Sequence, residues 1–130
     1  MYNNNSIRPR FGEIWMCNLY AEGSIQRGYR PVFVISNNQN NTYSPTINVI
    51  PLTSKMNKKQ LPMHVEIWDY QKYGLRAPST LLVEQISTVT IDNLTKRIGA
   101  ISDTYTLNVI YRAMIIQFPI LDIVNIHIAC

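Results

Sequence analysis

Apolar residues come in short runs separated by polar segments, the pattern typical of a small β-rich domain. Five of these runs are rich in β-branched and aromatic residues and are bounded by turn-forming residues: 11–19, 31–36, 46–54, 63–68 and 80–88. In the fourth run, Met63, Val65 and Ile67 alternate with polar residues and fall on one predicted face. We therefore predict five strands, with the Asn-rich segment 37–45 as a turn.

One segment near the C-terminal end has helical periodicity. Ser102 is its predicted N-cap and Pro119 ends it. Apolar residues between them follow the i, i+3, i+4, i+7 spacing of one helical face: Leu107, Ile110, Tyr111, Met114, Ile115 and Phe118. A second, shorter helix is predicted over 90–98, with Thr90 as its N-cap.

The predicted elements define a fold class. Several short strands, long polar loops and one C-terminal amphipathic helix indicate an α+β domain built on a small, curled antiparallel sheet. The final residues, 120–130, fit either a further strand or an irregular tail.

Length and composition fit one folded domain. The 130 residues are 46% hydrophobic and 15% charged, and a chain of this size buries about two thirds of its unfolded surface. We expect a single domain over 1–130, with a polar leader at 1–9 and an apolar C-terminal extension at 119–130. The first residues are too polar for a signal peptide. No run of about 18 apolar residues, the length of a membrane-spanning helix, is free of a charged or helix-breaking residue. The expected location is the cytoplasm, without membrane contact.

Positive charge is concentrated in the first half of the chain. Residues 1–60 carry seven Lys and Arg against two Asp and Glu, whereas residues 61–130 carry five against six. The excess favours an anionic partner bound by the first half, although a solubilising surface explains the same charges.

Several kinds of site are disfavoured. Cys17 and Cys130 have no metal spacing and form no disulfide framework. The two histidines have no third ligand at metal spacing, so neither a metal nor another cofactor is expected. Cys17 lies in an apolar run, which favours the core over a nucleophile. His64, which shares a predicted strand face with Glu66, is also interpreted as structural.

Arg30, Thr53 and Gln85 stand at or near the ends of predicted strands. A guanidinium is always charged and offers a planar fork of donors, so it suits the extra negative charge of a phosphorane. If the substrate is RNA, the 2′-hydroxyl is the nucleophile, and the protein holds the geometry, neutralises charge and assists proton movement. A threonine hydroxyl near the phosphate completes a metal-free site. The alternative is a surface ion pair at Arg30 and a simple β-forming residue at Thr53.

Six ordered blocks resemble the MazF/PemK family of toxin endoribonucleases: FGEIWMCNL, GSIQRGYRPVFVIS, NTYSPTINVIPLTSK, LPMHVEI, YGLRAPSTLLVEQIST and LTKRIGAIS. The resemblance covers about residues 10–118. It implies a small SH3-like antiparallel β-barrel of the CcdB/PemK type with a C-terminal helix, and a homodimer. It also implies the toxin of a type II toxin-antitoxin system, which inhibits translation and growth. Such a toxin cleaves single-stranded RNA without a metal and leaves a 2′,3′-cyclic phosphate and a 5′-hydroxyl.

The resemblance also implies roles for individual residues. The family's catalytic arginine falls on Arg30 and its catalytic threonine on Thr53. Its RNA-binding positions fall on seven further residues: Ser24, Gln26, Arg27, Lys55, Ser79, Leu82 and Gln85. The implied partners are single-stranded RNA and a cognate antitoxin, an acidic and partly disordered chain that covers the same basic surface.

Three departures from the family pattern concern its first loop and the fifth run. Ile25 replaces an acidic residue and Arg27 a glycine, so the loop is more positive and hinges less freely. Ser87 stands where an arginine is common, which leaves the cut-site preference open. Two alternatives to a toxin ribonuclease are a CcdB-like toxin that binds gyrase and an inactivated relative that only regulates its own operon. The presence of both Arg30 and Thr53 argues against the gyrase-binding alternative.

Overall fold

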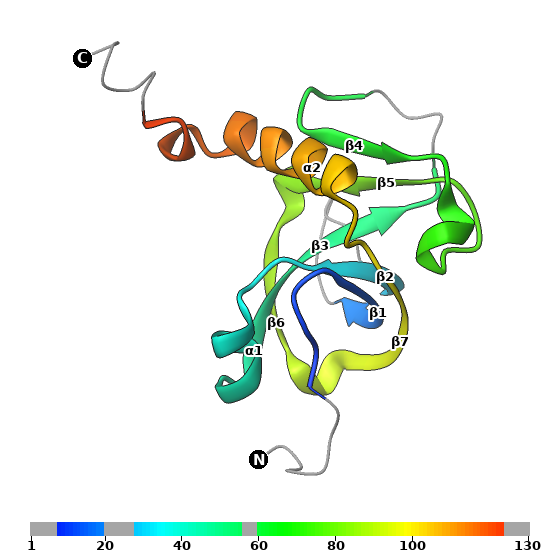
Figure 1. The fold of residues 1–130 in the computed structure, drawn as a ribbon. Coiled ribbons are helices and arrows are strands. Elements are labelled where there is room, and N and C mark those ends of the chain that lie inside the picture. Colours follow the sequence, from blue (N-terminus) through cyan, green and yellow to red (C-terminus); the bar gives the residue numbers. More distant parts are fainter. Residues whose placement is uncertain (1–7, 20–27, 56–59, 124–130) are drawn as a thin grey trace.

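The computed structural model describes residues 8–19, 28–55 and 60–123. These residues form seven strands, two α-helices and four short 3₁₀ turns (Figure 1). The strands are β1 (Glu13–Leu19), β2 (Gly28–Val34), β3 (Thr46–Thr53), β4 (His64–Ile67), β5 (Ser79–Leu82), β6 (Ser87–Thr90) and β7 (Leu94–Ala100). The helices are α1 (Asn38–Tyr43) and α2 (Thr104–Gln117). The 3₁₀ turns are Tyr70–Tyr73, Val83–Gln85, Ile91–Asn93 and Pro119–Leu121.

The strands form one strongly curled antiparallel sheet. Its order is β4-β5-β3-β2-β1-β7, and β6 pairs with the first half of β3. The ribbon bends round so that β7 closes over β1 and β2, while β4 and β5 extend to the other side (Figure 1). Among the described strands, the end strands β4 and β7 do not pair with each other, so the sheet stays open. The predicted α+β class, with a curled antiparallel sheet and a C-terminal helix, is confirmed.

Both faces of the central strands are buried. Phe33, Ile50 and Leu52 belong to one apolar cluster, which also takes residues from β4, β5 and α2. Val32 and Val49, which alternate with them along β2 and β3, belong to a second cluster with residues from β1 and β6. The sequence of a strand that is covered on both faces is a nearly continuous apolar run. This explains why these strands stand out in the sequence.

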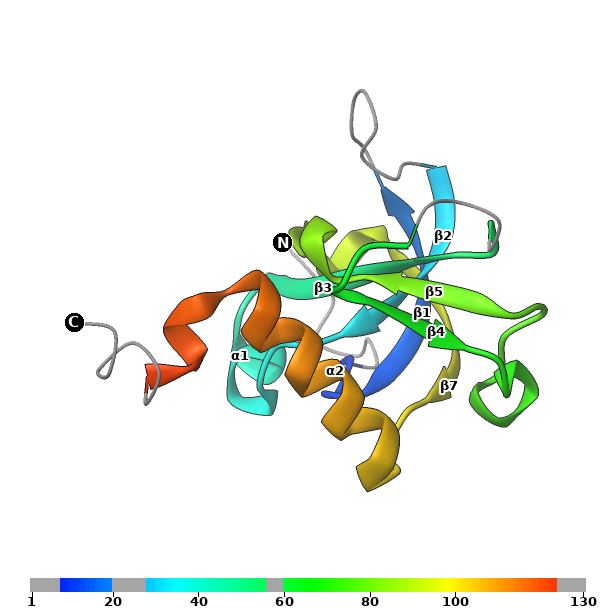
Figure 2. The same cartoon turned by 90° about the horizontal axis from the view of Figure 1, so that it is seen from above.

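Helix α2 lies across the β4–β5 end of the sheet (Figures 1 and 2). Its inner face is buried at Ile110, whereas Tyr111, predicted on the same face, is 53% exposed. The N-cap is Asp103 rather than Ser102, because the Asp103 carboxylate accepts the N–H of Thr106 at 3.0 Å. None of the helices in the described part of the chain has the length and apolar character that crossing a membrane requires.

Three segments differ from the predicted elements. Segment 37–45 contains α1, which forms because Asn37 caps it by accepting the N–H of Asn40 at 2.8 Å. The predicted strand 80–88 is divided into β5 and β6 by the turn Val83–Gln85. The predicted helix 90–98 is mostly β7, because its pairing with β1 overrides the local helical signal.

Candidate active site

A groove of about 720 Å³ lies where the start of β2 meets β7 and the segment after the turn Tyr70–Tyr73. Among the described residues that line it, four are cationic and none is acidic: Arg30, Arg76, Lys96 and Arg97. We call this site the basic groove. Charges of one sign in a concave surface raise the local concentration of an oppositely charged ligand. The groove is therefore suited to an anion.

The floor of the basic groove is apolar. Met16 on β1 is opposite Pro31 on β2 and opposite Lys96 on β7. Opposed residues of an antiparallel pair project to the same face, so these three side chains form a row across the sheet. Further apolar lining comes from Leu52, Leu75 and Ile98. Apolar surface beside cationic groups matches single-stranded nucleic acid, which carries flat bases on a charged backbone.

Two glycines bring one wall of the groove against β7. A Cβ atom on Gly74 would lie 1.8 Å from the carbonyl oxygen of Ile98, and one on Gly99 would lie 1.9 Å from that of Tyr73. Gly74 also has a φ of +80°, which glycine adopts at no steric cost. The Tyr73 hydroxyl donates to the Asp103 carboxylate at 2.7 Å, which ties the same wall to the start of α2. Backbone contact and this hydrogen bond fix the wall in place.

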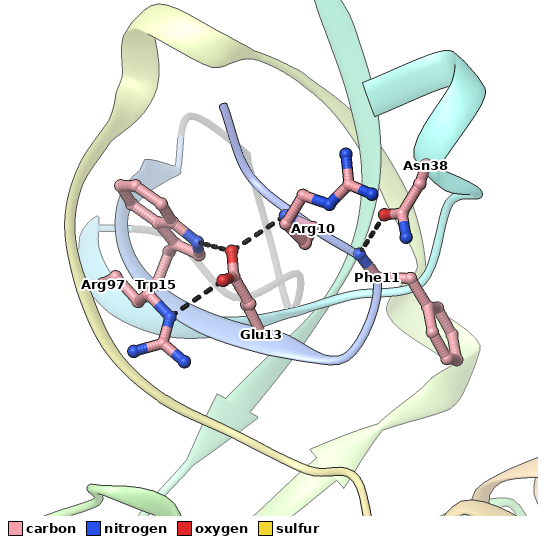
Figure 3. Close-up of polar contacts among 6 residues, drawn as sticks. All are labelled: Arg10, Phe11, Glu13, Trp15, Asn38 and Arg97. Atoms are coloured by element: carbon pink, nitrogen blue, oxygen red, sulfur yellow. Dashed lines mark hydrogen bonds and ion pairs between the residues drawn. The ribbon is translucent and has the colours of Figure 1, made fainter. Parts of the chain in front are cut away.

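Glu13 holds Arg97 at the edge of the groove. The Arg97 Nε–H donates to Glu13 Oε2 at 2.8 Å (Figure 3). Glu13 Oε1 accepts the backbone N–H of Arg10 at 2.8 Å and the indole N–H of Trp15 at 3.0 Å. A carboxylate with three donors is well oriented, and it in turn orients the guanidinium. The remaining N–H groups of Arg97 make no hydrogen bond within the described part of the chain.

The structure brings Arg30 and Thr53 to the same end of the sheet. The pairing of β2 with β3 ends at Val32 opposite Pro51, so Arg30 and Thr53 each lie two residues beyond the last pair, at this end of the sheet. Arg30 is partly buried and lines the groove. Thr53 is only 3% exposed, and its Oγ1 accepts the backbone N–H two residues further on at 3.3 Å. The next residue, Ser54, is the one that lines the groove.

The other predicted RNA-binding residues are dispersed. Ser79 is 4% exposed and lines the groove. Lys55 is exposed just beyond β3. Leu82 is 6% exposed and Gln85 ends a 3₁₀ turn, and neither is among the described residues that line the groove. Three predicted residues and one departure lie outside the described residues: Ser24, Gln26, Arg27 and Ile25.

Three of the four cations in the groove were missed by sequence reasoning. Arg76, Lys96 and Arg97 lie in the second half of the chain, where acidic residues balance the basic ones. The only sequence signals were the adjacent Lys96 and Arg97 and the single arginine of YGLRAPS. Pairing of β7 with β1 and the glycine contacts at the wall bring these charges beside Arg30.

Cys17 and His64 have structural roles. Cys17 is fully buried, and burial raises the pKa of its thiol to about 11, so the nucleophilic thiolate is rare near neutral pH. His64 Nε2 lies 3.0 Å from Glu84 Oε2, so its partner comes from the turn after β5 rather than from Glu66. Within the described ranges, no three His, Cys, Asp or Glu side chains are grouped as metal ligands would be.

Comparison with known proteins connects this geometry to a family. The sequence profile of the PemK-like, MazF-like toxins of type II toxin-antitoxin systems matches residues 10–117. The chain belongs to this family. Endoribonuclease MazF of Staphylococcus saprophyticus is 40% identical to this MazF-like chain over 95 residues, which are 72% of this chain and 78% of the relative.

Solved structures share the fold of this MazF-like chain. The Mycobacterium tuberculosis toxin MazF-mt6 matches it with a TM-score of 0.69 at 19% identity, over 82% of this chain and 96% of that chain. MazF of Deinococcus radiodurans matches with a TM-score of 0.69 at 18% identity, over 85% and 96%. A mycobacterial endoribonuclease in complex with its cognate antitoxin matches with a TM-score of 0.66 at 22% identity, over 86% and 94%.

Proposed function

We propose that this toxin is a sequence-specific endoribonuclease that cleaves single-stranded RNA, including mRNA, in the cytoplasm. The observation that carries the proposal is the basic groove. It contains Arg30, which matches the family's catalytic arginine, among four cations and no acidic residue from the described part of the lining. The relative from Staphylococcus saprophyticus, an endoribonuclease at 40% identity, supports the same activity.

The chemistry uses a nucleophile that belongs to the substrate. The 2′-oxygen attacks the neighbouring phosphorus and the bond from phosphorus to the 5′-oxygen breaks. The 2′-hydroxyl loses its proton and the 5′-oxygen gains one, which leaves a 2′,3′-cyclic phosphate and a 5′-hydroxyl. The protein then contributes position and charge. Arg30 donates to the non-bridging oxygens and stabilises the phosphorane. It is not assigned the role of general base, because a guanidinium keeps its proton and has no free nitrogen lone pair to accept another.

Thr53 binds the same phosphate or orients the 2′-hydroxyl in this scheme. Its place at the same end of the sheet as Arg30, each two residues beyond the last β2–β3 pair, supports the role. Because Thr53 Oγ1 accepts a backbone N–H, its own proton remains for donation. Ser54 offers a more exposed hydroxyl at the same place. Separate variants are therefore needed to assign the hydroxyl that acts.

Partners follow from the charge of the groove. An acidic antitoxin segment bound there would compete with RNA for the same cations. We propose that the toxin is a homodimer, as its family resemblance implies. The further proposed RNA contacts are Ser24, Gln26, Arg27, Lys55, Ser79, Leu82 and Gln85.

The first test is cleavage of mixed-sequence single-stranded RNA in the presence of EDTA, with the new 5′ ends mapped. We expect cleavage at a short motif, and we expect Arg30→Ala to lower the rate by about 100- to 1,000-fold, the usual cost of losing one donor to a developing charge. Arg112→Ala, which removes an exposed arginine from α2 outside the groove, should cleave like the wild type.

Loss of activity on chelation would contradict the metal-free scheme, and full activity of Arg30→Ala would contradict the assignment of the arginine. Thr53→Val should lose activity while Thr53→Ser keeps most of it. If Ser54→Ala loses activity and Thr53→Val does not, the hydroxyl is that of Ser54. Recovery of gyrase in a pull-down, with cellular RNA intact, would favour the CcdB-like alternative.

A further inference from the structure

One exposed aromatic side chain lies in the basic groove. Tyr29 on β2 directly precedes Arg30 and is 55% exposed. It is the sole aromatic among the described residues that line the groove. Tyr29 lies two positions before Pro31, so it projects to the same face as the apolar row formed by Pro31 and Met16. The ring therefore extends the apolar floor next to Arg30.

The ring of Tyr29 is held at its far end. The Tyr29 hydroxyl lies 2.7 Å from Thr95 Oγ1 on β7, and Thr95 Oγ1 lies 3.4 Å from the carbonyl oxygen of Met16. If the Thr95 hydroxyl donates its hydrogen bond to that carbonyl, Thr95 Oγ1 accepts a hydrogen bond from the Tyr29 hydroxyl. With its Cα in a paired strand and its hydroxyl bound, the ring has little rotational freedom left. A ring positioned in advance loses little entropy on binding a ligand.

We propose that Tyr29 is a stacking platform for the nucleobase next to the phosphate bound by Arg30. This inference rests on the proposed ribonuclease function. Successive residues of a strand project to opposite faces, so the Tyr29 ring lies on the face of the Pro31–Met16 row and Arg30 leaves the other face. Both residues nevertheless line the basic groove at the start of β2, which gives it an apolar surface for a base and a cation for a phosphate. Stacking on an aromatic ring holds single-stranded bases with little regard to sequence. Tyr29 thus contributes affinity and strand register, while hydrogen bonds from other groups read the motif.

The proposal is tested by measuring KM and kcat for cleavage of one RNA that contains the cut site of the wild-type toxin. Removing a stacking platform costs about 1–3 kcal/mol per base, so Tyr29→Ala should raise KM by about 5- to 150-fold. Its kcat should change much less, because stacking holds substrate and transition state alike. Tyr29→Phe keeps the ring and should stay within about threefold of the wild type.

Controls separate stacking from loss of structure. Tyr105→Ala removes a tyrosine that is 80% exposed on α2 and does not line the groove, so its KM should equal that of the wild type. Thr95→Ala keeps the ring but removes its anchor, and should raise KM less than Tyr29→Ala does. Thermal unfolding of each variant checks that the fold is retained.

The possible outcomes distinguish this inference from the proposed function. If the wild-type toxin cleaves no RNA, the proposed function fails. If the wild type cleaves and Tyr29→Ala has an unchanged KM, the stacking role is wrong. Equal losses in Tyr29→Ala and Tyr29→Phe would show that the hydroxyl matters rather than the ring. Unchanged RNA kinetics with weaker binding of the cognate antitoxin would assign Tyr29 to a protein interface instead.

Discussion

At the scale of single residues, the position of Arg30 follows from its neighbours. Pro31 restricts the preceding residue to extended backbone, which is the conformation that β2 requires. Arg30 is also opposite Cys17 of β1, a fully buried residue in a central strand. A guanidinium on a backbone held in this way can be aimed at one phosphate. This explains how a charged side chain stands at the start of a buried strand.

A second residue-scale feature is the contact between Gly99 and the backbone of Tyr73. We predict that Gly99→Ala lowers the free energy of unfolding by on the order of 3 kcal/mol, since a methyl group has no room there. Relief of the clash must also displace the groove wall that carries Arg76, so RNA affinity should fall. Urea unfolding and the KM for RNA measure the two effects. An unchanged free energy of unfolding would show that β7 and the groove wall at Tyr73 can move apart without loss of stability.

At the scale of elements, the N-terminus of α2 depends on a charged cap. Hydrogen bonds from Thr106 and then from Tyr73, with the nearby charge of Lys72, lower the pKa of Asp103 from 3.8 to about 2. A lowered carboxyl pKa stabilises the fold when the group is ionised. This contribution is complete above pH 3.8 and is lost as the pH falls towards 2.

Two variants separate the hydrogen bond of this cap from its charge. Asp103→Ala should lose about 1 kcal/mol of stability at neutral pH, whereas Asp103→Asn keeps an equally good capping side chain and should lose less. The difference between the wild type and Asp103→Asn should shrink as the pH is lowered from 4 to 2, because this range lies between the unfolded and folded pKa values of Asp103. Urea unfolding followed by circular dichroism at several pH values measures this. A difference as large at pH 2 as at pH 4 would contradict the role of the charge.

At the scale of the whole molecule, the basic groove draws its charge from segments far apart in the chain. Arg30 comes from β2, Arg76 from the segment after a 3₁₀ turn, and Lys96 and Arg97 from β7. Neither Arg76 nor Lys96 makes an ion pair with any residue that the structure describes, whereas Arg97 pairs with Glu13. Arg76 and Lys96 therefore carry charge that RNA phosphates can neutralise.

These two cations should control how RNA binding depends on salt. Each phosphate contact on a single strand contributes about 0.7 to the slope of log affinity against log salt concentration. We predict that Arg76→Gln and Lys96→Gln each reduce the slope by about 0.7 and weaken binding of unrelated RNA sequences similarly. Arg112→Gln removes the same charge from α2 and should leave the slope unchanged. If all three variants behave alike, net charge rather than the groove attracts RNA.

Much of the fold was predictable because its signals are local. The apolar runs of β1 to β4 and the periodicity of α2 reflect which faces are buried, and burial acts directly on sequence pattern. The failures occur where long-range contacts decide. Residues 94–98 belong to the predicted helix 90–98 but form most of β7 through pairing with β1, and the run 80–88 is divided because β5 and β6 pair with different parts of β3.

By itself, the sequence determined the fold class, the family and the proposal of Arg30 as the main charged group of the site. These conclusions depend on short motifs and on burial patterns, which are visible in each stretch of sequence without knowledge of its long-range contacts. Only the tertiary structure decided the composition of the groove. Arg76, Lys96 and Arg97 join Arg30 in the groove through the pairing of β7 with β1 and through the backbone contact at Gly74, and no single position in the sequence specifies these long-range contacts.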